Sequence, residues 1–111
     1  MAYNLELAER MRAVVNGMAS ATEKKMFGGV GFMVNGNMAC GVHGDGLISR
    51  VGDAAYPKAK SQPHVRDFDM TGRPMKGWVV VDLAGCQSEI ELRRWVSVGI
   101  DFAASLPPKL P

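Results

Sequence analysis

Cys40 and His43 are separated by two residues, a spacing at which a thiolate and an imidazole can bind zinc or form a nucleophile–base pair. The segment around them alternates as a β-strand does, and residues three apart in a strand point to opposite faces. The two side chains therefore cannot share one metal ion. His64 and Cys86 are distant in sequence, and no spacing supplies a third group to orient a base. We predict no metal site, no cofactor and no catalytic set.

Segment 50–76 carries the only local excess of basic residues, with six Lys and Arg against three Asp. Such a bias can form an anion-binding or nucleic-acid surface, although a solvated rim is the commoner outcome. Trp78 follows this segment, and it can either anchor the core or act as a stacking platform beside a cation. The residues that we consider candidates for binding an anion or a partner are Arg50, Arg73, Lys76 and Trp78.

Glycines at 28, 29 and 31 resemble a phosphate-binding loop only superficially. The dinucleotide-binding fingerprint needs a strand before the glycines and a helix after them, whereas a strand and a hairpin follow here. We interpret these glycines as positions where strands bend or pack closely.

The composition is that of one globular domain spanning residues 1–111, with 47% hydrophobic and 22% charged residues. A net charge of +2 is too weak to indicate a nucleic-acid clamp or a membrane surface. No apolar run approaches the roughly twenty residues of a membrane span, and Glu6 and Glu9 interrupt any signal peptide. We expect a cytoplasmic protein in which Cys40 and Cys86 are free thiols.

Apolar residues from Leu7 to Met18 recur every three or four positions and predict an amphipathic helix. Between Lys24 and Val51 the period changes to two, and Asn35-Gly36 is a strong hairpin signal. This pattern predicts a three-stranded antiparallel meander over 30–34, 38–43 and 47–51.

A two-residue hairpin loop assigns the side chains of the meander to two faces. One face is expected to hold Val30, Phe32, Val34, Ala39 and Gly41, and the other Gly31, Met33, Met38, Cys40 and Val42. Both faces are rather apolar, and one layer of helices covers only one of them. We therefore expect a homodimer that covers part of the second face, with Met33, Met38 or Val42 near the contact.

The second half of the chain predicts a short helix with Asp53 as its N-cap, an ambiguous strand over 64–70, and a clear strand from Trp78. Ser88 and Glu91 form a capping box before a long helix, which Pro107 and Pro108 end. This order predicts an α+β fold of two layers: an antiparallel sheet of about four to five strands with the N- and C-terminal helices on one face.

The inward positions of the sheet and the last helix predict the centre of the core. Phe32, Trp95 and Phe102 are expected to meet between the sheet and the two long helices. Gly99 costs the middle of the last helix about 1 kcal/mol relative to Ala, so we expect it to allow a close approach to the sheet.

The stretch Lys25-Met26-Phe27-Gly28-Gly29, followed by an apolar strand and a glycine turn, resembles the opening motif of the TfoX N-terminal domain family. Similarity continues through Gly72-Arg73-Pro74-Met75-Lys76-Gly77-Trp78 and covers about residues 7–109. The resemblance implies a two-layer α+β domain and a link to regulation of DNA-uptake competence. The named regulators resemble this chain in their first half and continue with a helical domain; the family supplies no catalytic residues.

Three functional hypotheses follow from these observations. The first is a non-enzymatic regulatory or protein-interaction domain with an unidentified protein partner. The second is a weak nucleic-acid or phosphoanion-binding module that uses segment 50–76. The third is a small enzyme, for which the sequence offers no convergent acid, base and nucleophile.

Overall fold

Helix α1 (Leu5–Met18) opens the fold, and its N-cap Asn4 accepts a hydrogen bond from the Leu7 amide. The computed structural model describes residues 3–26, 28–69, 72 and 74–109. The strands are β1 (Thr22–Met26), β2 (Gly29–Val34), β3 (Asn37–His43), β4 (Gly46–Arg50), β5 (Val65–Asp67) and β6 (Trp78–Val81). The remaining elements are α2 (Tyr56–Lys60), the short 3-10 helix η1 (Leu83–Gly85) and α3 (Glu89–Ser105).

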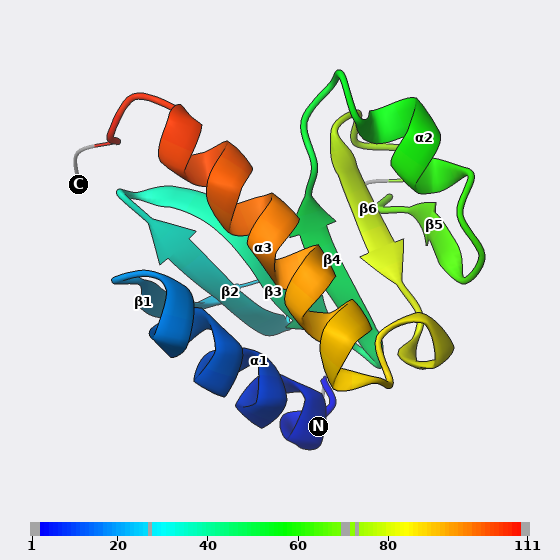
Figure 1. Ribbon diagram of the computed structural model, residues 1–111, viewed down its shortest axis with the longest axis horizontal. Coiled ribbons are helices and arrows are strands. Elements are labelled where there is room, and N and C mark those ends of the chain that lie inside the picture. The colour runs from blue at the N-terminus through cyan, green and yellow to red at the C-terminus, as the bar shows by residue number, and fades with distance from the viewer. Residues whose placement is uncertain (1–2, 27, 70–71, 73, 110–111) are drawn as a thin grey trace.

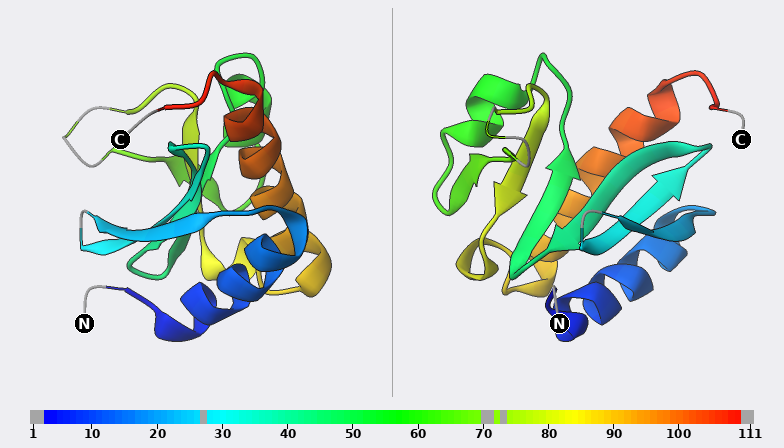
Figure 2. Two further views of the ribbon diagram at one scale, coloured as in Figure 1. Left: turned by 90° about the vertical axis from the view of Figure 1, so that its left-hand side faces the viewer. Right: turned by 180° about the vertical axis from the view of Figure 1, so that it is seen from behind.

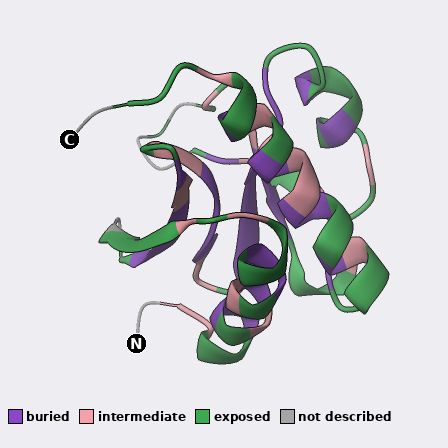
Figure 3. Ribbon diagram, turned by 60° about the vertical axis from the view of Figure 1, so that its left-hand side comes forward, coloured by how far each residue is buried: buried purple, intermediate pink, exposed green. Residues whose placement is uncertain are grey.

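One antiparallel sheet contains all six strands, in the order β1-β2-β3-β4-β6-β5. The three α-helices lie on one face of this sheet, as Figures 1 and 2 show. Buried positions line the inward sides of the sheet and the helices (Figure 3), where Phe32 and Trp95 belong to one core. The predicted α+β class and the single helical layer are confirmed.

The sheet has six strands rather than the four to five that the sequence predicts. The additional strand is β1, whose sequence Thr-Glu-Lys-Lys-Met shows no apolar alternation. It forms because its backbone pairs with β2, and because the Arg12 guanidinium of α1 binds the Glu23 carboxylate at 2.6 and 2.9 Å. Lysines on this edge strand oppose edge-to-edge aggregation.

The predicted faces of β3 are wrong for Cys40 and Val42, which lie in the core under the helices. A β-bulge between the pairs Phe32–Cys40 and Met33–Met38 leaves Ala39 as an extra residue in β3. One extra residue moves every later side chain of the strand to the opposite face. Val42 is 1% exposed and therefore contributes almost no surface to a dimer contact. Cys40 and His43 still point to opposite faces, as predicted.

The chain itself covers part of the second face of the sheet. Phe68, which follows β5, packs there on Ile48 and Val80, and these three residues form a second buried cluster. Met38, Met75 and Trp78 pack against this cluster. The Met75 amide donates to the Phe68 carbonyl at 2.9 Å and so closes the covering segment. The second face is thus less dependent on a partner than its sequence pattern indicates.

Two further expectations need correction. Asp53 does not cap α2, whose N-cap is Ala55 without a side-chain hydrogen bond, because the turn over 53–55 delays the helix. Phe102 lies outside the core and is half-buried, since it is two turns beyond Trp95 and reaches the end of the sheet.

The Ser88 cap is confirmed, with its hydroxyl 3.2 Å from the Glu91 amide. Gly99 is also confirmed as a close approach, because a Cβ there would collide with the Ala39 carbonyl oxygen.

Candidate functional site

Arg50 and Trp78 are brought together by the pairing of β4 with β6, in which they are direct cross-strand partners. Both residues are half-buried at the end of their strands. The chain leaves the sheet at Gly52 and enters it after Gly77, and both glycines have positive φ angles (88° and 93°) that other residues rarely adopt. The Gly77 carbonyl accepts hydrogen bonds from the amides of residues 51 and 52, which fixes this end.

The Arg50 guanidinium lies over two aromatic rings. Its central carbon is 4.9 Å from the centroid of the Trp78 ring and 5.4 Å from that of Phe102. Each cation–π contact of this kind contributes an interaction free energy of about 0.5–1 kcal/mol at exposed sites, and it holds the guanidinium in one orientation. We call Arg50, Trp78 and Phe102 the Arg50 cluster. Two strands and α3 supply its members.

Gly52 explains how Phe102 reaches the Arg50 cluster from α3. A Cβ at position 52 would lie 2.5 Å from the Phe102 ring, so only glycine leaves room for the ring there. Phe102 is the member of the candidate site that sequence reasoning missed, because its place on the buried stripe of the helix predicted a core role. Only the relation between the end of β4 and the end of α3, which is not local in sequence, brings it to Arg50.

Arg50 differs from the other described arginines in its hydrogen bonds. Each of the others donates at least one hydrogen bond to a described residue, whereas Arg50 donates none. A guanidinium has five N–H donors arranged to match a carboxylate or phosphate group. The Arg50 cluster therefore holds an oriented cation whose donors have no acceptor among the described residues.

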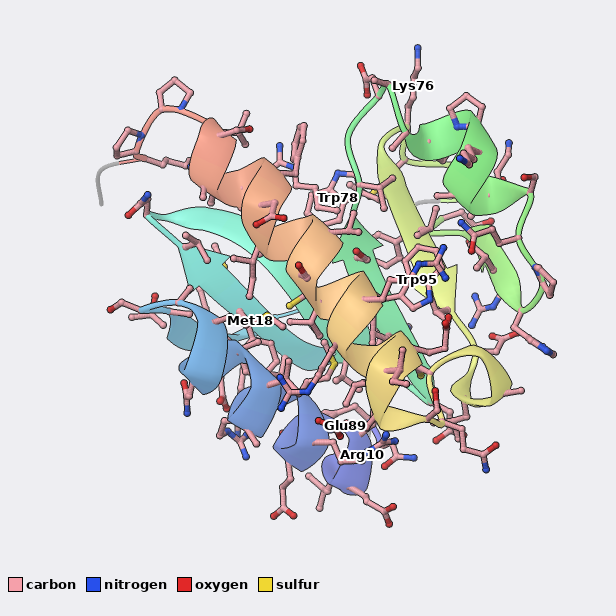
Figure 4. All side chains as sticks on the ribbon, in the orientation of Figure 1. Arg10, Met18, Lys76, Trp78, Glu89 and Trp95 are labelled. Atoms are coloured by element: carbon pink, nitrogen blue, oxygen red, sulfur yellow. The ribbon has the colours of Figure 1, made fainter. Side chains whose placement is uncertain are left out.

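Of the other sequence candidates, Lys76 is not part of this cluster. Lys76 is exposed, and Figure 4 shows its side chain pointing away from the body of the molecule. Arg73 lies outside the described residues. Two more cations of segment 50–76 are already paired: Lys60 lies 3.7 Å from Asp67, and Arg66 lies 3.1 Å from Asp82. Lys60 and Arg66 thus bind aspartates of the fold itself.

Comparison with known proteins gives one family. Residues 13–103 match the TfoX N-terminal domain. The chain belongs to the TfoX N-terminal domain family. All three residues of the Arg50 cluster lie within the matched segment of this TfoX N-terminal domain. No curated protein and no solved structure gives a significant match.

Both thiols of this TfoX N-terminal domain have a raised pKa. Burial raises the pKa of the Cys40 thiol to about 12, and burial is also the main cause that raises the pKa of Cys86. A raised pKa reduces the thiolate that nucleophilic chemistry needs. A hydrogen bond to the Asp67 carboxylate raises the pKa of the Tyr56 hydroxyl, which keeps that group protonated.

The described residues also bear on metal binding and on membrane insertion. Among the described residues, no three His, Cys, Asp or Glu side chains gather as metal ligands. None of the described helices is long and apolar enough to cross a membrane.

Proposed function

We propose that this chain is a non-catalytic regulatory domain that binds an acidic group of a protein partner through the Arg50 cluster. Membership of the TfoX N-terminal domain family fits a domain of the kind found in competence regulators. The observation that carries the proposal is the Arg50 guanidinium, which two rings orient while its N–H donors find no acceptor among the described residues. Orienting a side chain in advance lowers the entropy that binding costs.

Several observations favour binding over catalysis. The two thiols and the Tyr56 hydroxyl have raised pKa values, which is the wrong direction for a nucleophile at neutral pH. His43 packs edge-on against the Phe68 ring, with ring centroids 6.4 Å apart, and Cys40 is on the opposite face of the sheet. Cys40 and His43 therefore do not form a thiol–base pair, which supports the proposal of a binding domain.

A phosphoanion or nucleic acid is the second candidate for the Arg50 cluster. The cation beside the Trp78 ring is the observation that favours it, since single-strand binders combine stacking with positive charge. A protein carboxylate is the better match because nucleic-acid affinity depends on many cations acting together. Here Lys60 and Arg66 are already paired with aspartates.

The test titrates the ¹⁵N-labelled protein with a capped pentaglutamate peptide and follows the indole N–H signal of Trp78. The Arg50→Gln variant should bind about tenfold more weakly, which corresponds to the ~1.4 kcal/mol that one charge-assisted hydrogen bond contributes. The matched control is Arg93→Gln, which removes an exposed arginine that is paired with Glu89 on α3. Equal weakening by both variants would show that only net charge matters.

A parallel titration with a short DNA duplex decides between the two candidates. The proposal expects the duplex to bind more weakly than pentaglutamate at equal ionic strength. Tighter binding to DNA, with a steep loss as salt rises and a dependence on Arg50, would favour the nucleic-acid reading. A Trp78 signal that moves with neither probe would contradict both readings.

A further inference from the structure

Two cavities adjoin α3 on the helical face of the sheet: one lies between α3, the loop after α2 and η1, and the other lies between α2 and α3. We call the two together the α2–α3 groove. One has a volume of about 300 Å³ and the other about 190 Å³. Gln62, Arg94 and Trp95 line both cavities, so the two are adjacent. The groove is lined by none of the residues of the Arg50 cluster.

The indole N–H of Trp95, which lines both cavities, is a hydrogen-bond donor that a ligand in this groove can use. The side chain is 3% exposed and, in Figure 4, extends from α3 toward α2 and β5. Its indole N–H donates to no described residue, although buried indole N–H groups usually find an acceptor. No described polar side-chain atom is both sealed from solvent and unpaired, so this N–H reaches the surface, and the two cavities are the surface that Trp95 lines.

The two cavities differ in chemistry. Val51, Ala55, Ala59 and Val98 give the smaller cavity an apolar floor. Its volume corresponds to about six water molecules, which is room for one branched aliphatic side chain. The larger cavity holds His64 and the end of Arg94, which is fixed by hydrogen bonds to Gln62 (2.6 Å) and Glu91 (3.0 Å). The smaller cavity thus suits an apolar group, and the larger cavity suits the polar backbone of a peptide.

The rim of the groove is positively charged. Lys58 lines the apolar cavity and forms no ion pair with a described residue. The guanidinium of Arg94 lies over the Trp95 ring, with its central carbon 5.0 Å from the ring centroid, and forms an ion pair with Glu91. A partner segment that carries a carboxylate next to its apolar side chain therefore complements both the floor and the rim.

We propose that the α2–α3 groove binds a short peptide segment of a protein partner, in which a branched aliphatic residue is followed by an acidic one. The aliphatic side chain fills the cavity floored by Val51 and Val98. A backbone carbonyl of the segment accepts the Trp95 indole N–H, and the carboxylate lies near Lys58. This site is separate from the Arg50 cluster and does not depend on it.

The test uses three capped tetrapeptides, Gly-Leu-Glu-Gly, Gly-Leu-Gln-Gly and Gly-Ala-Glu-Gly, titrated into the ¹⁵N-labelled protein. The chain has two tryptophans, so two indole N–H signals report two sites. The Leu-Glu peptide should shift the Trp95 signal saturably, and binding of its carboxylate at the Arg50 cluster would move the Trp78 signal independently. The Leu-Gln peptide should bind about two- to fivefold more weakly, the range for one exposed ion pair. The Ala-Glu peptide should lose about tenfold or more.

A matched pair of variants locates the binding. Ala55 and Ala54 are neighbouring exposed residues, but only Ala55 lines the groove. Ala55→Phe should abolish the Trp95 shift, whereas Ala54→Phe should leave it unchanged, with the dispersed spectrum showing that both variants fold. Equal effects of the two variants, or a Trp95 signal that the Leu-Glu peptide never moves, would overturn the proposal. A shift of Trp78 alone would overturn it too, while supporting an acidic ligand at the Arg50 cluster.

Discussion

Arg50, Arg94 and Lys60 each lie over an aromatic ring, and they differ in what else holds them. Lys60 also pairs with Asp67, and Arg94 also binds Glu91 and Gln62, so the structure uses both to join its own elements. Arg50 has two rings and no described acceptor. The same side-chain chemistry therefore has a structural role at two positions and is left available for a ligand at the third.

The two cysteines show the opposite situation, because burial lowers the reactivity of their thiols. Both thiols are buried and form no disulfide, and burial raises the pKa of Cys40 to about 12. We predict that an alkylating reagent leaves Cys40 of the folded protein unlabelled between about pH 8 and 10, because burial keeps that thiol protonated there. Denaturation without reductant should release both thiols, and mass spectrometry should then find two labels.

The unfolded protein is the control for this prediction. A free thiol with a pKa of about 8.5 ionises across this range, so the unfolded protein should react faster as pH rises. Cys40 of the folded protein should stay unreactive throughout. Labelling of Cys40 in the folded chain at the lower pH, or absence of labels after denaturation, would contradict the prediction.

At the scale of elements, the sequence predicts what local patterns encode. Ser88 caps α3 as its spacing predicts, and the alternating residues around Asn35-Gly36 form the expected hairpin. The bulge at Ala39 has no local signal, and it moves Cys40 and Val42 to the other face. Strand β1 also escapes prediction, because its pairing with β2 rather than its own pattern defines it.

The candidate sites follow the same division. Arg50 and Trp78 are candidates from residue type alone, and the structure places them together by strand pairing. Phe102 joins them only because Gly52 leaves space at the end of β4. The α2–α3 groove depends on how two helices pack on the sheet. The sequence pattern of α3 indicates Trp95 as a core residue and gives no sign that its indole N–H has no acceptor among the described residues.

Two helical glycines give a matched test of element packing. Gly99→Ala places a methyl group against the Ala39 carbonyl of β3, and overpacking of this kind costs about 1–3 kcal/mol. Gly17→Ala in α1 meets no atom within 4 Å and should stabilise the fold by about 0.4–1 kcal/mol. Chemical denaturation measures both. A Gly99→Ala variant as stable as Gly17→Ala would show that α3 does not need its close approach to the sheet.

At the scale of the whole molecule, the exposed apolar side chains lie elsewhere than the sequence pattern indicates. The second face of the sheet is partly covered by Phe68 and Met75. Large exposed side chains instead include Leu5 at 51%, Leu83 at 38% and Ile90 at 77%. The start of α1, η1 and the start of α3 lie at one end of the molecule (Figure 1). This end, which we call the Ile90 end, is the better place for a contact between copies.

The predicted homodimer is therefore expected to form through the Ile90 end rather than through Met33. A stable contact buries about 1,200–2,000 Å² in total, roughly a tenth to a sixth of the 6265 Å² surface of each copy. Sedimentation at micromolar concentration should give twice the 12.0 kDa mass of the chain. Ile90→Glu should shift the protein toward the monomer, because a charge without a partner is costly at the centre of an interface.

Met33→Glu is the matched control for this prediction. Met33 is half-buried on the second face of the sheet, so the variant introduces the same charge away from the Ile90 end. It should leave the sedimentation of the dimer unchanged while circular dichroism shows that both variants fold. Dissociation by Met33→Glu alone would return the contact to the second face. A wild-type protein that sediments as a monomer at every concentration would contradict the dimer itself, and the exposed Ile90 would then remain a solvent-facing residue of the first turn of α3.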